Sequence, residues 1–139
     1  MALRVKLRVR ASRVIETTAL VNTGFEVERP QLLIPLRLAK ELGLWPPPPS
    51  AELIELGTAG GPVRNYMVPN ALEVWVITED REVGPVTCDA LISNIETEVL
   101  INDKLAGELK IVILNPATGE WRFYDETITR HTESPTYWV

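Results

Sequence analysis

The sequence predicts a mainly β fold, a barrel or sandwich of short strands with one or two short helices. Two observations support this prediction. Short segments of alternating apolar and polar residues recur along the chain, and turn residues such as Gly, Pro, Asn and Asp separate them. The 139 residues suit one domain, and 45% apolar with 24% charged residues is typical of a globular protein.

The first strand has the clearest pattern. In residues 3–10 apolar side chains alternate with cations, and residues 14–21 follow after a turn short enough for a hairpin. Further strands are predicted at 31–34, 52–56, 63–68, 71–78, 82–92, 99–101, 110–114 and 120–123.

Two short helices interrupt the strands. Residues 35–43 begin with Pro35 and end with Gly43, the usual asymmetry of helix ends. Asn102 is expected to cap a helix over residues 103–108. A domain over residues 1–124 is therefore predicted, followed by a polar tail over 125–139. The aromatic end of this tail is expected to dock on its own chain or on a partner.

Composition argues against several kinds of protein. Cys88 and His131 are the only cysteine and the only histidine, so neither a disulfide scaffold nor a zinc site is expected. No phosphate-binding glycine motif occurs, and no cofactor is predicted. No apolar run approaches the ~18 residues of a membrane span, so a cytoplasmic protein without a membrane partner is expected. Eleven prolines and a single glutamine, Gln31, favour a heat-adapted source.

The charge is uneven along the chain. The formal net charge is −5, which argues against nucleic-acid binding. Five of the fourteen Lys and Arg residues nevertheless lie between Arg4 and Arg13, before the first acid, Glu16. This basic strand predicts a solvated face or, as the alternative, a contact surface for an acidic partner.

Four segments, taken in order, resemble one family. Residues 19–26, ALVNTGFE, resemble the LVDTGA signature of retropepsin-like aspartic proteases. IPLRLAKELGL at 34–44 resembles the helix after that signature, LGTAGGPVRNY at 56–66 the flap hairpin, and VLINDKL at 99–105 the segment that closes the fold. The resemblance covers residues 3–123. It implies a retropepsin-like acid-protease barrel that forms a homodimer, with two signature loops meeting at the two-fold axis.

The resemblance assigns the catalytic loop to Asn22, Thr23 and Gly24, with Asn22 in place of the catalytic aspartate. The family's two carboxylates share one proton, whereas a carboxamide has no proton to exchange at working pH. Thr23 matches the threonine that bonds across the dimer. Ile101 replaces a family glycine and Asn102 a frequent arginine, so the site is expected to differ by more than one residue.

The resemblance also implies a cleft for an extended segment. Its expected substrate-binding residues are Glu26, Gly57, Ala59, Gly60, Gly61 and Ile101. Glu26 would accept backbone N–H groups of the bound strand, and the glycines would give the flap its flexibility. Asp89 is an alternative carboxylate, although a turn or edge position is expected for it.

Three functions follow from these expectations. The first is a catalytically inactive homodimer that binds an extended peptide or protein segment under the flap. The second is an aspartic endopeptidase in which an asparagine, natural or engineered, inactivates the catalytic position. The third is a structural or assembly protein with no open cleft, in contact with partners through its basic strand or its tail.

Overall fold

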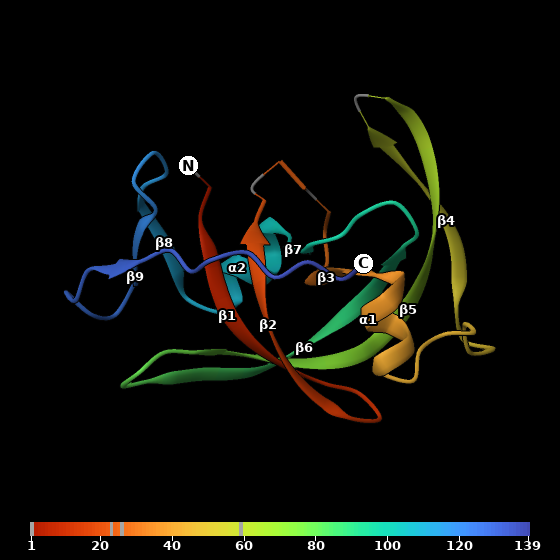
Figure 1. Ribbon diagram of the computed structural model, residues 1–139, viewed down its shortest axis with the longest axis horizontal. Helices are drawn as coiled ribbons and strands as arrows, with labels where there is room; N and C mark the ends of the chain where they lie inside the picture. The colour runs from red at the N-terminus through yellow and green to blue at the C-terminus, as the bar shows by residue number, and fades with distance from the viewer. Residues whose placement is uncertain (1, 23, 26, 59) are drawn as a thin grey trace.

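The computed structural model describes residues 2–22, 24–25, 27–58 and 60–139 (Figure 1). Two helices and ten strands follow one another along these residues. In chain order they are β1 (Arg4–Arg10), β2 (Val14–Val21), β3 (Gln31–Pro35), α1 (Leu36–Glu41), β4 (Glu52–Thr58), β5 (Gly61–Ile77), β6 (Glu82–Ser93), β7 (Val99–Ile101), α2 (Asp103–Glu108), β8 (Ile111–Asn115), β9 (Glu120–Phe123) and β10 (Arg130–His131).

Six of the strands close into a barrel. Neighbours follow the order β1-β2-β7-β3-β6-β5, and β5 pairs back onto β1, so the ring has no open edge. β2 with β7 and β3 with β6 are parallel, and the other pairs of the ring are antiparallel. β4 lies outside the ring, paired with β5. The predicted mainly β barrel with two short helices is confirmed.

Alternation along the strands determines which side chains fill the barrel. In β1, Val5, Leu7 and Val9 are fully buried, while the cations between them face outward. Leu105 from α2 and Phe123 from β9 are also fully buried in the same core. Both helices have six residues, and no helix in the described part of the chain is long and apolar enough to cross a membrane.

β5 is one strand of 17 residues, not the two strands predicted over 63–68 and 71–78. Its pairing with β6 shifts between Val68 and Leu72, where Pro69 and Asn70 form a bulge, and Asn70 has a φ of 51°. A bulge inserts extra residues into one strand and bends it without ending it. The Pro-Asn pair therefore interrupts the regular pairing, but it does not separate two strands.

A second, three-stranded sheet packs beside the barrel. Its order is β10-β9-β8, so residues of the predicted tail form its edge. From β10 the chain runs back across β1, where the Glu133 N–H donates to the Arg4 carbonyl at 2.9 Å. Trp138 Nε1 donates to the Thr17 hydroxyl at 2.9 Å, so this aromatic residue docks on its own chain.

Candidate functional site

Asn22 lies directly after β2, where the chain leaves the barrel. Its N–H donates to the Ile101 carbonyl at 2.9 Å, and its own carbonyl accepts from the Phe25 N–H at 3.1 Å. Its side-chain Oδ1 accepts from the Gly24 N–H at 3.1 Å. This is the side-chain-to-backbone bond that asparagine makes in turns. Asn22 is half-buried, and its side-chain oxygen helps to hold the loop.

Ile101 lies beside this loop, as the resemblance implies. β7 runs parallel to β2, with Ile101 opposite Val21, and on its other side antiparallel to β3. The Ile101 side chain is fully buried in the core. Since β-branched side chains suit a pleated, enclosed position, Ile101 fills interior space and contributes its backbone carbonyl to the loop.

The expected flap is a hairpin of β4 and β5. In its register Gly57 is opposite Pro62 and Thr58 opposite Gly61, with the exposed Gly60 at the tip. Gly61 has a φ of 109°, which favours glycine. The hairpin and the loop after β2 extend to the same end of the molecule in Figure 1.

Three predicted site residues, Thr23, Glu26 and Ala59, lie outside the described residues. Asn22, Gly24 and Ile101 are brought together. Gly57, Gly60 and Gly61 belong to the hairpin.

Asn102 ties the loop, β3 and α2 together. Its Oδ1 accepts from the N–H of Leu105 at 2.9 Å and from the N–H of Gln31 at 3.0 Å. Its Nδ2 donates to the Arg29 carbonyl at 2.8 Å. The predicted helix cap is confirmed, and the same fully buried side chain also fixes the chain leading into β3.

Asp89 lies inside β6, between β3 and β5, and is fully buried, whereas a turn or edge position is expected from the sequence. Arg29 donates to both of its oxygens, at 2.8 and 2.7 Å. Gln31 Nε2 adds a bond at 3.0 Å, and the Asn70 N–H another at 2.9 Å. Burial favours the neutral acid, but the bonds from Arg29, Asn70 and Gln31 outweigh it and hold the pKa of Asp89 below its usual value.

Asp89 therefore stays ionised with its oxygens occupied, and it is a poor replacement for a catalytic carboxylate. Sequence reasoning missed its partners. The alternation of β6 gives no hint that a charge points inward, and Arg29 lies sixty residues away in sequence.

Asp103 and Cys88, the other candidate reactive residues, have structural surroundings of their own. Asp103 Oδ1 accepts from the N–H of Lys104 at 2.8 Å in the first turn of α2. Cys88 is buried, and burial raises the pKa of its thiol above the usual range, which makes it inert. Within the described ranges, no three His, Cys, Asp or Glu residues cluster in a way that could hold a metal ion.

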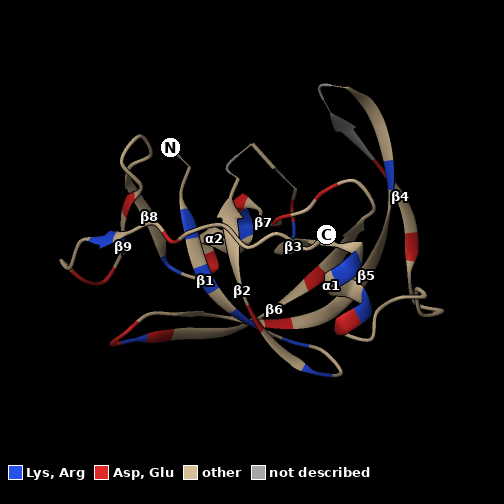
Figure 2. Cartoon of the chain, viewed as in Figure 1, with Lys and Arg blue, Asp and Glu red and all other residues tan. Residues whose placement is uncertain are grey.

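Neighbouring acids neutralise the cations of the basic strand, Arg4 to Arg13. Each of its five cations forms an ion pair, and Figure 2 shows the two signs interspersed over the molecule. The partners are Glu98 for Arg4, Glu16 for Lys6, Glu82 for Arg8, Glu73 for Arg10 and Glu41 for Arg13. This pairing favours a solvated strand face over a surface for polyanions.

Comparison with protein-family models and with curated proteins finds no match to this chain. The resemblance to retropepsin-like proteases therefore has only the four sequence motifs behind it.

Proposed function

We propose that the chain is a catalytically inactive, retropepsin-like homodimer that binds an extended peptide or protein segment under the β4–β5 hairpin. One observation carries the proposal: the residue expected to be the catalytic aspartate is Asn22, whose Oδ1 accepts from the Gly24 N–H. In a symmetric dimer both copies supply a carboxamide. Neither can take a proton from water or give one to a peptide carbonyl, so general acid–base catalysis is lost.

Two acids considered above, Asp89 and Asp103, give little compensation for the missing catalytic carboxylate. Asp89 is held by four hydrogen bonds and remains ionised, and the Asp103 side chain bonds to the start of α2. A bound segment would therefore persist without being cleaved.

Binding would use the exposed backbone of the hairpin. Among the strands that the structure describes, β4 is the last of its sheet and is paired on one side only, with β5. A free strand edge can accept an extended peptide by forming further main-chain hydrogen bonds, and side-chain pockets then give specificity. Leu53 on β4 is 53% exposed and provides an apolar contact.

A matched pair of variants tests the loss of catalysis. Cleavage of a mixed peptide library is followed from acidic to neutral pH for the natural chain, for Asn22→Asp and for Asn115→Asp. Asn115 also accepts backbone N–H bonds, but in the exposed β8–β9 turn. We expect cleavage by Asn22→Asp alone, because a carboxylate can also accept the Gly24 bond and restores the titrating group. Cleavage by the natural chain would refute an inactive site.

Binding and assembly are tested separately. Fluorescence anisotropy with labelled members of the library should detect binding to the natural chain, and sedimentation should detect a dimer. A monomer, or no binding by any peptide, would overturn the proposal. If Asn22→Asp cleaves but the natural chain binds nothing, the endopeptidase with an inactivating asparagine is favoured. If neither occurs, the assembly protein is favoured.

A further inference from the structure

One arginine on the outer face of the small sheet has no acid to pair with. Trp121 and Phe123 are buried, so the alternation of β9 turns Arg122, which lies between them, away from the core. Arg122 lines an open hollow of about 550 Å³, and the same hollow has two apolar residues on its wall, Leu114 and Tyr124. None of the residues that line it belongs to the candidate site.

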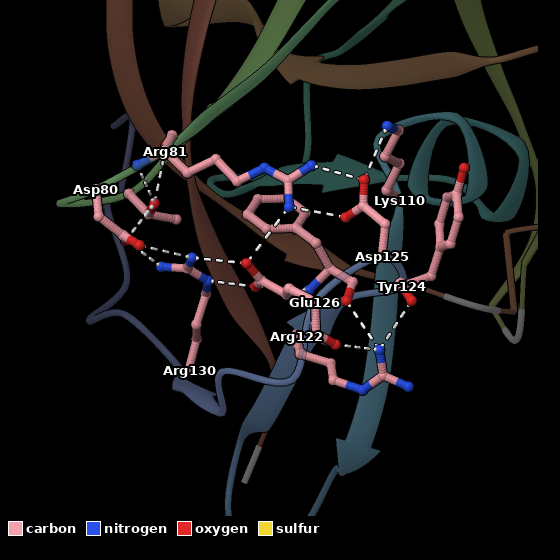
Figure 3. A network of polar contacts seen from close by, with 10 residues as sticks. Asp80, Arg81, Lys110, Arg122, Tyr124, Asp125, Glu126 and Arg130 are labelled. Atoms are coloured by element: carbon pink, nitrogen blue, oxygen red, sulfur yellow. Dashed lines mark hydrogen bonds and ion pairs between the residues drawn. The ribbon is translucent and has the colours of Figure 1, made fainter.

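The main chain holds the guanidinium of Arg122 in one orientation. Its Nη1 donates to the carbonyls of Phe123 at 3.0 Å, of Tyr124 at 3.0 Å and of Glu126 at 2.7 Å, as Figure 3 shows. Nε and Nη2 donate to no acceptor among the described residues. Because the guanidinium is already fixed, a partner that binds to these free donors loses little side-chain entropy.

The positive charge of Arg122 is in excess of its surroundings. Arg122 forms no ion pair within the part of the chain that the structure describes. The network beside it balances three cations against three acids, namely Arg81, Lys110 and Arg130 against Asp80, Asp125 and Glu126 (Figure 3). The acids near the hollow are therefore already paired, and charge complementarity favours an added carboxylate.

The neighbouring strand β8 has a free edge. Among the described strands it is the last of the small sheet, and it pairs with β9 alone. Residues 111–114 are Ile-Val-Ile-Leu, without the charge or proline that commonly protects an edge strand. Val112 is opposite Arg122 in the register, so both lie on the outer face, and Leu114 is 45% exposed. This edge therefore suits an extended segment that adds as a further strand.

We propose that β8 binds an extended acidic peptide segment as a fourth strand of the small sheet. A carboxylate of the segment accepts from the free donors of Arg122, and its apolar side chains pack on Val112 and Leu114. The segment residue opposite Val112 lies about two strand spacings, roughly 10 Å, from the Arg122 backbone. A glutamate and an arginine side chain span this distance together.

A second copy of the chain is a poorer occupant of this edge. Pairing of β8 with itself would bring two unneutralised Arg122 residues into one sheet, where like charges repel. The site is also independent of the proposed function, because it uses neither the loop at Asn22 nor the β4–β5 hairpin.

The test titrates the full ¹⁵N-labelled chain with the peptide acetyl-Thr-Val-Glu-Val-Thr-amide. The backbone N–H resonances of β8 and the Nε–H resonance of Arg122 should shift saturably. Arg122→Gln should weaken binding about fivefold, the upper range for an exposed ion pair, because the guanidinium is fixed in advance. Lys40→Gln is the matched control. It removes an exposed cation of α1 that has no ion pair among the described residues, and the affinity should not change.

Three further peptides separate the contacts on the natural chain. Glutamine in place of glutamate removes the charge, lysine reverses it, and N-methylation of the three central residues removes main-chain donors. All three peptides should bind more weakly than the glutamate peptide. Equal binding of the glutamine peptide, or tighter binding of the lysine peptide, would overturn the Arg122 contact. Equal binding of the N-methylated peptide would overturn strand addition. These peptides keep the test decisive if Arg122→Gln fails to fold.

Three other outcomes would overturn the site as a whole. The first is no shift of the β8 resonances with the glutamate peptide. The second is a shift of the β4 resonances in place of those of β8, which would assign the peptide to the β4–β5 hairpin. The third is a shift of the β8 resonances with rising protein concentration in the absence of peptide, which would assign the edge to a second copy.

Discussion

Two asparagines, Asn22 and Asn102, use their side chains in place of backbone groups where the barrel meets the candidate loop. The Asn22 oxygen accepts one N–H, and Asn102 accepts two and donates one. A carboxamide suits both positions because it carries a donor and an acceptor without a charge. The difference is burial: Asn22 is half-buried, and Asn102 is fully buried.

We expect Asn102→Ala to lower the free energy of unfolding by roughly 3 kcal/mol. It removes a helix cap, usually worth about 1 kcal/mol, and leaves the buried groups of Gln31 and Arg29 unpaired at about 1 kcal/mol or more each. Chemical denaturation measures the change. Asn115→Ala is the control, because its turn is exposed and water replaces the lost bonds, so a loss below about 1 kcal/mol is expected. Equal losses in the two variants would contradict the role given to Asn102.

Patterns in the sequence predict the roles of residues in local structure better than their contacts with distant parts of the chain. The cap at Asn102 follows from an asparagine placed before a helical segment, and the structure has this cap. The four bonds to Asp89 arise because β3 and the β5 bulge pack on either side of β6. No pattern along the chain indicates that these segments lie close together. The surroundings of the Trp121 indole likewise form only when the C-terminal chain folds back onto β1.

The β5–β6 pair shows how elements adapt to the barrel. Both strands are long, and their register shifts twice, between Val68 and Leu72 and between Val74 and Val76. Such shifts bend strands and allow a sheet to close. Opposite the second shift, Gly84 has a φ of 138°, and a Cβ there would lie 2.6 Å from the Val74 carbonyl oxygen. This position therefore needs glycine.

Gly84→Ala should lower the free energy of unfolding by about 1–3 kcal/mol, because alanine is strained at this φ and its methyl group meets the Val74 carbonyl. Gly107→Ala is the matched control. Gly107 lies in α2, and a Cβ added there would meet no atom of the described residues within 4 Å beyond its own helix backbone and chain neighbours. Alanine should therefore raise stability at this position by roughly 0.5–1 kcal/mol. Thermal denaturation of both variants shows whether each substitution raises or lowers stability. A neutral Gly84→Ala would show that the strands relax around the added methyl group.

At this scale the sequence predicts most elements, since β2, β9 and α2 match their predicted ranges. Local alternation and turn residues are sufficient for strands with one buried face. They fail at β5, where the bulge is a tertiary feature, and at β10. That strand has only two residues and exists because β9 offers it an edge.

Across the whole molecule, ion pairs and the C-terminal chain join the small sheet to the barrel. The guanidinium groups of Arg81 and Arg130 lie 4.7 and 5.2 Å from the ring centroid of Phe123. The same two groups form ion pairs with Asp80, Asp125 and Glu126 (Figure 3). Trp138 then fastens the chain end to β2. The closed ring of six strands follows from pairings between distant segments, and a sequence pattern does not state which strand meets which.

The attachment of the small sheet should weaken in acid. Hydrogen bonds from Arg130, Phe123 and Arg81 lower the pKa of Glu126 to about 2, against the opposing effect of burial, and Arg130 holds the pKa of Asp80 below its usual value. Acids with a lowered pKa stabilise the fold fully above their unfolded pKa of about 4–4.5, and this contribution is lost as the pH falls toward the folded value. Glu126→Gln should therefore lower the melting temperature near neutral pH, and the gap to the natural chain should narrow as the pH falls below about 4. Glu52→Gln is the control, because it removes an exposed acid without an ion pair among the described residues. Its melting temperature should differ little from that of the natural chain at every pH.

If the difference in melting temperature between Glu126→Gln and the natural chain stays constant down to the lowest pH, the ionised carboxylate does not hold the small sheet to the barrel.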